Sequence, residues 1–212
     1  MLNNFELEEI SNHYDFNLIV LMIDDLVNFK PIEKDIFFNK FLIPQTDFAL
    51  VTFHPETVAV SDNNYFAQEM KIALTEISKK LHLVITMPNA DTLGSVYRKK
   101  LQDLKAENPL KITLIENFGK ENYFTAMFYG KILIGNTSSG ILEAASFGKY
   151  VVNVGDRQKG RAQSKNILET KFESLAIIEN AKKAIELGIF KSENIYYKKG
   201  AADAIIKIIK NL

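Results

Sequence analysis

The sequence contains no cysteine among its 212 residues. This absence excludes disulfide frameworks, thiolate nucleophiles and zinc sites built from cysteine. Lysine and arginine together equal aspartate and glutamate in number, so the formal net charge is zero. A neutral chain lacks the long-range field that draws proteins to nucleic acid or to anionic membranes. We therefore expect no nucleic-acid partner, and any recognition of phosphate must be local.

Long hydrophobic runs are missing near the start of the chain. The longest one there, residues 18–23, stops at Asp24 and is far shorter than the ~20 residues that span a bilayer. The first ten residues are acidic and lack the basic segment of a secretory signal. The composition, 47% hydrophobic and 25% charged, is that of an ordinary globular protein. We expect a cytoplasmic protein with no membrane partner.

From residue 47 onward, short β-branched runs alternate with longer amphipathic stretches, which is typical of βαβ units. Strands are expected at residues 48–53, 82–87, 111–115, 131–134, 150–154 and 174–178. Helices are expected at residues 63–80, 92–107, 121–129, 139–147, 179–187 and 199–210, with Gly148 capping the fourth. The pattern predicts an α/β fold with a Rossmann-like, doubly wound parallel sheet over residues 47–212.

The first 46 residues fit this pattern less well. Pro31 occupies a position typical of the first residue of a helix. An apolar stripe follows it, made by Ile32, Ile36, Phe37 and Phe41. Residues 2–28 have no clear period. We therefore expect residues 1–46 to be a remnant of a different domain.

In an open parallel sheet, ligands bind beyond the carboxyl ends of the strands. The fourth expected strand is followed by GNTSSG, residues 135–140, whose hydroxyls belong to Thr137, Ser138 and Ser139. Hydroxyls and free N–H groups at the start of a helix can bind an anion. An ordinary helix cap is the alternative interpretation. The segment lacks the lysine of a P-loop and the spacing of GxGxxG, so neither nucleotide motif applies.

Two further positions carry charge near the same edge. Glu143 lies one turn inside the helix that follows GNTSSG, where it either complements the helix dipole or accepts hydrogen bonds from hydroxyls such as those of a ribose. The segment GDRQKGR, residues 155–161, follows the fifth expected strand and carries Arg157, Lys159 and Arg161. Glycines on either side would let a guanidinium approach a phosphate. The alternative is a solvated basic loop.

His54 follows the first expected strand, in the segment HPET. It is either a catalytic group or a histidine that serves the turn. The sequence contains no HExxH segment and no acidic cluster of the kind that binds a metal. We expect neither a metal nor a cofactor.

Together these segments resemble the UDP-N-acetylglucosamine 2-epimerase family, in particular its hydrolysing branch, which forms N-acetylmannosamine. The match is densest over residues 134–161, IGNTSSGILEAASFGKYVVNVGDRQKGR, and HPET and MPNAD (residues 87–91) match two further motifs. The resemblance covers roughly residues 31–212. It implies that this chain corresponds to the C-terminal half of a two-domain enzyme of GT-B type. It also implies UDP or UDP-N-acetylglucosamine as the ligand.

The resemblance assigns roles to individual residues. Ser138 and Arg157 would contact the diphosphate, with Thr137 in support, and Glu143 would hold the ribose hydroxyls. His54 would assist the departure of UDP.

Two further positions match the family on the substrate side. Tyr123 falls where the family places an aromatic ring against the uracil, although the family residue is phenylalanine. Asn89, in MPNAD, matches a residue that faces the substrate.

The implied reaction eliminates UDP across C1–C2 of the sugar and then adds water, which releases UDP and N-acetylmannosamine. The family's catalytic carboxylates lie in the N-terminal domain, and residues 17–31 resemble the crossing between the two domains. We therefore expect a UDP-binding half with little activity alone, from a truncated or split gene. Its last expected helix, 199–210, or residues 1–30 would mediate self-association. The C-terminal domain of a UDP-sugar glycosyltransferase is a weaker alternative.

Overall fold

The computed structural model describes residues 26, 28–56, 60–89, 92–197 and 210. Contacts divide the chain into two compact units, residues 1–29 with 196–212 and residues 30–195. The elements named below belong to the second unit. The expected helix 199–210 and the unpatterned residues 2–25 lie outside the described residues. No helix in the described part of the chain is long and apolar enough to cross a membrane.

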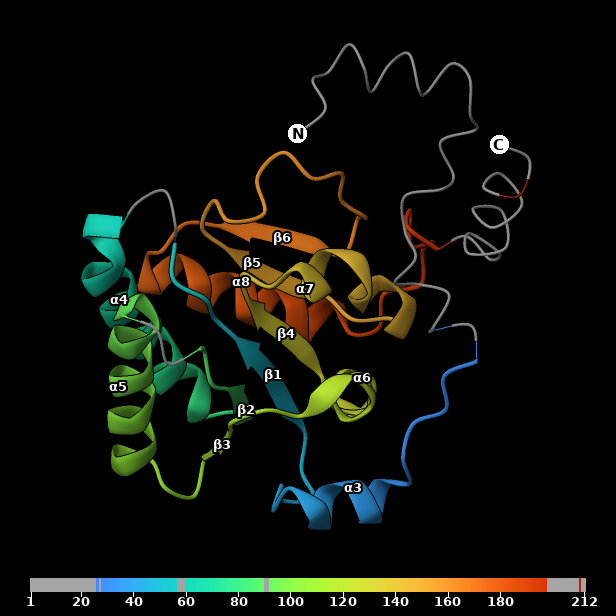
Figure 1. Ribbon diagram of the computed structural model, residues 1–212, viewed down its shortest axis with the longest axis horizontal. Coiled ribbons are helices and arrows are strands. Elements are labelled where there is room, and N and C mark those ends of the chain that lie inside the picture. The colour runs from blue at the N-terminus through green and yellow to red at the C-terminus, as the bar shows by residue number, and fades with distance from the viewer. Residues whose placement is uncertain (1–25, 27, 57–59, 90–91, 198–209, 211–212) are drawn as a thin grey trace. The chain divides into compact units, whose positions relative to one another are not determined.

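Six parallel strands form the centre of the second unit (Figure 1). They are β1 (Phe48–Thr52), β2 (His82–Thr86), β3 (Ile112–Ile115), β4 (Ile132–Gly135), β5 (Val151–Val154) and β6 (Ile167–Thr170). Their spatial order is β3-β2-β1-β4-β5-β6, so the direction of winding reverses between β1 and β4. This arrangement confirms the predicted doubly wound sheet, and the reversal marks the place where ligands bind in such folds.

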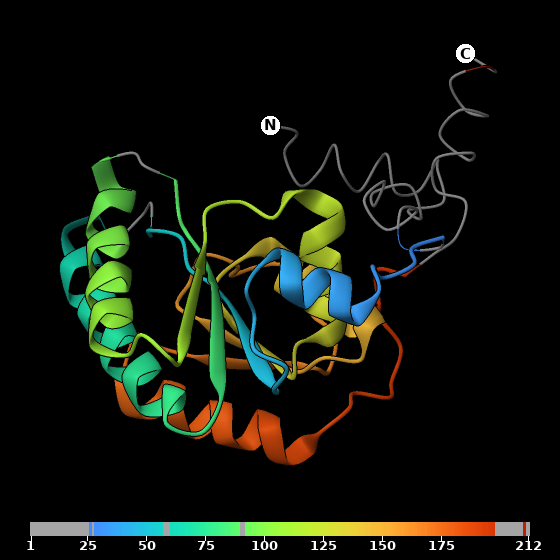
Figure 2. The same cartoon turned by 90° about the horizontal axis from the view of Figure 1, so that it is seen from below.

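Helices cover both faces of the sheet, as Figures 1 and 2 show. The α-helices are α3 (Lys34–Lys40), α4 (Asn63–Ser78), α5 (Thr92–Glu107), α6 (Gly119–Tyr129), α7 (Ser138–Leu142) and α8 (Ser174–Leu187). Two 3₁₀ segments, η1 (Val60–Asp62) and η2 (Ala144–Phe147), also occur in the described part of the chain. Helix α4 packs against both α5 and α8 on one face, whereas α3 and α6 pack together on the other.

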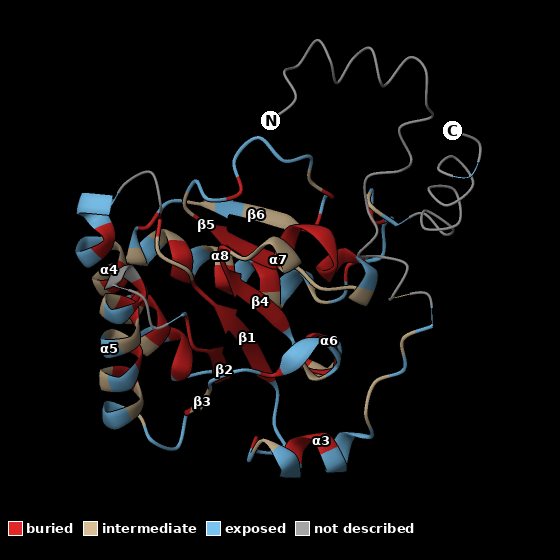
Figure 3. Ribbon diagram, viewed as in Figure 1, coloured by how far each residue is buried: buried red, intermediate tan, exposed pale blue. Residues whose placement is uncertain are grey.

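The alternation of side chains along β1 explains why two cores form. Ala49, Val51 and Phe53 belong to the core beneath α4, α5 and α8. Phe48 and Leu50 belong to the core beneath α3 and α6. Every residue of β1 is buried, and Figure 3 shows the buried central strands between the two helical layers. Burial on both faces is what a near-continuous apolar strand in a parallel sheet predicts.

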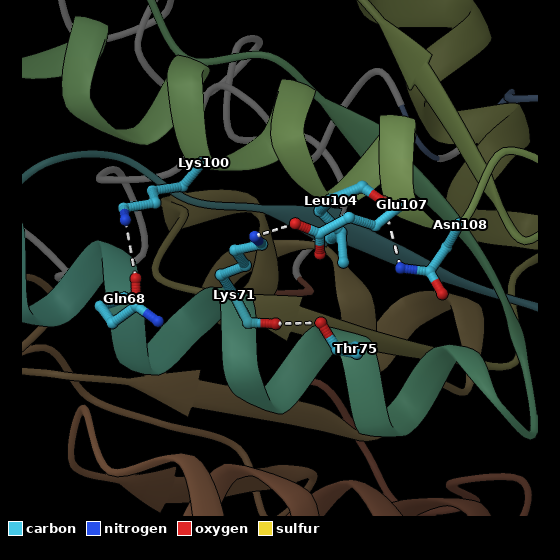
Figure 4. Close-up of polar contacts among 7 residues, drawn as sticks. All are labelled: Gln68, Lys71, Thr75, Lys100, Leu104, Glu107 and Asn108. Carbon is cyan, nitrogen blue, oxygen red and sulfur yellow. Dashed lines mark hydrogen bonds and ion pairs between the residues drawn. The ribbon is translucent and has the colours of Figure 1, made fainter.

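Polar side chains join α4 to α5 at their surfaces (Figure 4). Lys71 Nζ lies 2.6 Å from Glu107 Oε1, and Lys100 Nζ donates to Gln68 Oε1 at 2.7 Å. The contact partners are partly exposed, so each pair adds little to stability. The buried apolar residues beneath them carry the packing of these helices.

The first five predicted strands match β1 to β5 to within one residue at each end. The sixth was wrong, because residues 174–178 form the first turns of α8 and the strand is Ile167–Thr170. Buried Ile177, Ile178, Ala181 and Ala184 follow helical spacing. Strand β6 pairs with β5 alone and is only half-buried, so its sequence lacks the apolar run of a central strand.

Two other helix predictions need correction. The segment 139–147 divides into α7 and η2, with Glu143 at the junction, and Gly148 caps η2 in a left-handed conformation with φ 68°. Near the start, the helix begins at Lys34 and not at Pro31. Ile36 is 57% exposed there while Phe38 is buried, because the buried face of the helix is centred on Phe37 and Phe38 and not on the predicted stripe.

Gly135 ends β4 with φ 145° and allows this strand to approach β1 closely. It lies opposite Thr52 in the β1–β4 register. A Cβ atom at residue 135 would lie 1.8 Å from the Thr52 carbonyl oxygen, far inside contact distance. Residue 135 must therefore be glycine for the two strands to meet at the carboxyl edge.

We predict that Gly135→Ala lowers the free energy of unfolding by about 3 kcal/mol or more, because the added methyl forces β4 away from β1. Urea unfolding followed by circular dichroism measures this. Gly119→Ala is the control, since φ there is also positive but a Cβ would meet no atom within 4 Å. Its expected cost is about 1 kcal/mol. Equal losses in the two variants would contradict the steric argument.

Candidate functional site

Asn136 holds the turn that follows β1. Its side chain is buried, and its Oδ1 accepts the His54 backbone N–H at 2.8 Å while its Nδ2 donates to the His54 carbonyl oxygen at 2.9 Å. The amide thus pairs with the backbone as a neighbouring strand would. A buried polar group needs such partners, because leaving them unmade costs about 1–3 kcal/mol each. The position of His54 is therefore fixed by the residue that follows β4.

Asn63, the first residue of α4, holds Glu56 in the same way. Its Oδ1 accepts the Glu56 backbone N–H at 2.9 Å, and its Nδ2 donates to the Glu56 carbonyl oxygen at 2.9 Å. The hydroxyl of Tyr97, in α5, donates to the same Oδ1 at 3.2 Å. The side-chain amides of Asn136 and Asn63 therefore fix the backbone at both ends of the segment His54–Glu56.

Glu56 connects this turn to the loop after β5. Its carboxyl is 5% exposed, and Oε1 accepts the backbone N–H of Arg157 at 3.2 Å. Burial raises the pKa of Glu56, while bonds from Asn136 and Arg157 oppose that shift. Gly155 leaves the room that the carboxyl needs, since a Cβ there would lie 2.7 Å from Glu56 Oε1. The loop is thus built around a buried acid.

Two side chains of the same loop reach back toward β1 and β4. Arg157 Nη1 donates to the Pro55 carbonyl oxygen at 2.9 Å. Gln158 is buried, and its Nε2 donates to the Asn136 carbonyl oxygen at 2.8 Å. Segments that follow β1, β4 and β5 therefore form one hydrogen-bonded unit at the carboxyl edge of the sheet.

A polar cavity of about 320 Å³ opens at this unit. Its lining residues come from all three segments: His54, Thr137, Ser138, Arg157, Gln158 and Arg161. Four of these were predicted site residues, namely His54, Thr137, Ser138 and Arg157. Guanidinium groups and hydroxyls are the donors that bind phosphate oxygens. Chemically, the cavity suits a small anion.

Glu143 lies at the junction of α7 and η2 and does not line this cavity. Its side chain is 1% exposed, and neither carboxylate oxygen has a hydrogen-bond partner within the described part of the chain. Burial raises the pKa of Glu143 to about 7, although its own backbone N–H, the nearby Ser139 hydroxyl and the charge of Lys120 act in the opposite direction. A buried carboxyl with two unsatisfied acceptors is an arrangement that a ligand with hydroxyl donors would complete.

Tyr123, in α6, points its hydroxyl toward the end of β1. The oxygen lies 3.2 Å from Thr52 Oγ1, which lies 2.7 Å from Thr86 Oγ1. Burial raises the pKa of Tyr123 to about 12, and the Thr52, Ser139 and Thr137 hydroxyls partly offset this. The ring thus lies beside the hydroxyls of the GNTSSG segment and is not among the residues that line the polar cavity.

The remaining predicted residues lie elsewhere. Asn89, after β2, is exposed and does not line the polar cavity. Ser139 does not line the polar cavity either, and its hydroxyl lowers the pKa of both Tyr123 and Glu143. A second cavity of about 1010 Å³, with Phe66 and Phe172 in its wall, shares Arg157 with the polar one. Among the described residues, no group of three His, Asp or Glu side chains could hold a metal ion.

Sequence reasoning missed the residues that build the site: Asn63, Asn136, Glu56 and Gln158. Three of them stand inside segments that the sequence had already marked, HPET, GNTSSG and GDRQKGR. One signal in the sequence could have found Asn136, namely an asparagine directly after a buried strand. Its side-chain amide can form the two hydrogen bonds that the next backbone residue of the strand would otherwise form. The partner of Asn63 is seven residues earlier in the chain, which no periodic pattern reveals.

Known proteins provide an independent comparison. A family model described as UDP-N-acetylglucosamine 2-epimerase matches residues 19–210. GDP/UDP-N,N'-diacetylbacillosamine 2-epimerase (hydrolyzing) of Campylobacter jejuni is 36% identical over 128 residues, covering 59% of this chain and 33% of the relative. Polysialic acid biosynthesis protein P7 of Escherichia coli is 29% identical over 167 residues, covering 76% of this chain and 42% of the relative.

A similar fold occurs in solved structures. The UDP-GlcNAc 2-epimerase from Neisseria meningitidis, solved with bound UDP-GlcNAc, superposes with a TM-score of 0.68 at 19% identity. The match covers 84% of this chain and 49% of that one. This chain spans half or less of the length of the relatives to which it is compared.

We predict that Asn136→Ala lowers the free energy of unfolding by about 3 kcal/mol, because two backbone groups of His54 lose their buried partner. Chemical denaturation measures the loss. Asn108→Ala is the matched control: that side chain is half-buried and makes a single bond, to the Leu104 carbonyl oxygen, so a loss below about 1 kcal/mol is expected. If Asn136→Ala were as mild as the control, the amide pairing would not hold the turn.

Proposed function

This chain belongs to the UDP-N-acetylglucosamine 2-epimerase family, and on that basis we propose that it is the UDP-binding half of a hydrolysing epimerase. The observation that carries the proposal is the polar cavity at the ends of β1, β4 and β5. Its ligand is UDP or a UDP-linked 2-acetamido sugar. No cofactor takes part in the proposed reaction.

The cavity holds the diphosphate in this proposal. Arg157 supplies a guanidinium, and Ser138 supplies a hydroxyl, with Thr137 beside it. The net charge of the chain is zero, so attraction for the anion arises locally. A charge-assisted hydrogen bond of this kind contributes about 1.5–3 kcal/mol. The position of the cavity, next to the reversal between β1 and β4, is where folds of this class bind nucleotides.

Glu143 accepts hydrogen bonds from the ribose hydroxyls. The support is its two buried oxygens without partners in the described structure, which two hydroxyl donors would satisfy. The ribose must displace part of what covers Glu143, since the side chain is 1% exposed. Ser139 helps to position the carboxyl, and Tyr123, close to the same segment, lies against the uracil. Asn89 lies on the sugar side.

The proposed reaction begins with loss of the C2 proton from the sugar and departure of UDP from C1, which leaves a glycal. Water then adds across the double bond, its hydroxyl to C1 and a proton to C2, and releases the 2-epimer. His54 assists the departure of UDP. It is well suited to this task because Asn136 fixes its backbone beside Arg157 and Ser138. The base for C2 belongs to the N-terminal domain, as the family resemblance implies.

Two names among the relatives bear on the sugar. One relative is named for GDP/UDP-N,N'-diacetylbacillosamine and the other for polysialic acid biosynthesis. The description of the matching family model supports our first choice: we propose UDP-N-acetylglucosamine as the substrate, with N-acetylmannosamine as the product. The diacetylated sugar is the second candidate, favoured by the higher identity of its relative.

We also propose a cellular location, a partner and an oligomeric state for this chain. It acts in the cytoplasm, either with a separate polypeptide that supplies the N-terminal carboxylates or as a truncated half with little activity alone. Self-association through residues 1–30 or 199–210 is the corresponding proposal for its oligomeric state. A role as a glycosyltransferase C-terminal domain is disfavoured by the family match over residues 19–210.

We predict saturable binding of UDP to the 212-residue chain, with at least about ten-fold weaker binding by Arg157→Ala, since the guanidinium contacts the diphosphate directly. Isothermal titration calorimetry measures both affinities. Lys131→Ala is the control, because this cation precedes β4 at the opposite edge and pairs with Asp47. An equal effect of the two substitutions, or no binding by the unmodified chain, would contradict the proposed function.

We further predict that UDP binding tightens as pH rises through about 7. Burial raises the pKa of Glu143 to about 7, so the carboxyl is mostly protonated at pH 6 and mostly ionised at pH 8. Ribose hydroxyls donate to the ionised form, so affinity should rise up to about ten-fold over this range.

The change of affinity with pH should be smaller in Glu143→Gln, which cannot ionise. The difference between the two proteins removes every pH-dependent contribution that does not come from residue 143, including that of UDP itself. Calorimetry at pH 6, 7 and 8 supplies the values. Identical pH profiles for the two proteins would show that Glu143 does not meet the ribose.

A further inference from the structure

The three cations of the loop after β5 lie around two different cavities. Arg157 borders both the polar cavity and the larger one. Arg161 borders the polar cavity, whereas Lys159 borders the larger one. The three cations are close together in the sequence GDRQKGR, but the structure places Lys159 and Arg161 at different cavities, with Arg157 bordering both.

The backbone of the loop explains this separation. The Lys159 N–H donates to the Asp156 carbonyl oxygen at 2.9 Å, and the Arg161 N–H donates to the Gln158 carbonyl oxygen at 3.3 Å, so two turns follow each other. Gly160 stands at the third position of the second turn with φ 84°, a value that glycine adopts readily. The chain therefore turns back, and Arg161 reaches the same cavity as Arg157.

Gln158 anchors the loop that follows β5. Its side chain is 4% exposed and is attached through Nε2 to the Asn136 carbonyl oxygen. Arg157 precedes this anchor, and Arg161 closes the turn that begins at it. Both guanidinium groups are therefore placed relative to the hydroxyl of Ser138 by a buried side chain and not by solvated loop residues.

The charged side chains of the loop differ in their partners. Arg157 Nη1 donates to the Pro55 carbonyl oxygen, and Lys159 Nζ lies 3.5 Å from Asp156 Oδ2. For the exposed guanidinium of Arg161, no side-chain hydrogen bond or ion pair is found with the described residues. Its N–H groups face solvent at the cavity, and they can donate hydrogen bonds to a ligand without breaking an existing contact.

We propose that Arg161 is a second guanidinium ligand of the diphosphate, in the cavity that Thr137 and Ser138 also line. This inference rests on the proposed function, because it assumes that the polar cavity receives the diphosphate of UDP. A diphosphate offers more acceptor oxygens than one guanidinium can satisfy, and Arg157 already uses part of its donor capacity on Pro55. A second planar fork at the same cavity completes the binding of both phosphates.

The test compares Arg161→Ala with Lys159→Ala in the 212-residue chain, titrated calorimetrically with UDP. Both substitutions remove one exposed cation from the same loop, so a purely long-range charge effect would weaken both equally. We expect Arg161→Ala to weaken UDP binding at least about ten-fold, and Lys159→Ala to weaken it less than about three-fold. Arg161→Lys should fall between the two, because lysine keeps the charge but loses the fork.

The salt dependence of UDP binding gives a second measurement. Arg161→Ala should depend less steeply on salt concentration than Lys159→Ala, since it removes a direct phosphate contact. Circular dichroism should show that both variants keep the fold, as both side chains are exposed. If the unmodified chain binds UDP and the two alanine variants bind it alike, the inference about Arg161 is wrong while the proposed function stands. If the unmodified chain does not bind UDP, the proposed function and the inference both fail.

Discussion

The geometry of the candidate site depends on the buried side-chain amide of Asn136. An amide offers a donor and an acceptor side by side, which matches the N–H and carbonyl of one backbone residue, here His54. The backbone carbonyl of Asn136 meanwhile receives Gln158 from the loop after β5. Three segments that are far apart in the chain are therefore tied to one residue with no exposed surface. Aspartate or leucine, with similar volume, would not provide both bonds.

Local electrostatics at this edge combine buried acids with exposed cations. The buried carboxyl of Glu56 accepts a hydrogen bond from the backbone N–H of Arg157, and the side chain of Arg157 lines the cavity. Glu143 remains buried without partners for its oxygens in the described structure, and burial raises its pKa. Such a carboxyl lowers the stability of the protein progressively as pH rises from 4.5 to about 7, because over this range the unfolded chain releases the proton that the buried carboxyl keeps. Retaining it is consistent with a role in binding.

Much of the fold follows from the sequence, because buried parallel strands are read directly from short apolar runs. Both edge strands are largely half-buried, but β3 has the apolar sequence ITLI and was found, whereas β6, with the sequence ILET, was not. The residues that face the cavity, such as Ser138 and Arg157, were also predictable from their motifs. Residues that hold those residues in place were not predictable, since the pairing of Asn136 with His54 joins positions 82 apart and depends on the order of strands.

The most direct measurement is the mapping of backbone amide shifts in the 212-residue chain during titration with UDP, by heteronuclear NMR. We expect the largest changes to fall together on residues 54–56, 136–139 and 157–161, with the same saturation curve for all three segments. Changes confined to one segment, or centred on the wall of the larger cavity near Phe172, would contradict the claim that these strand ends form a single diphosphate site.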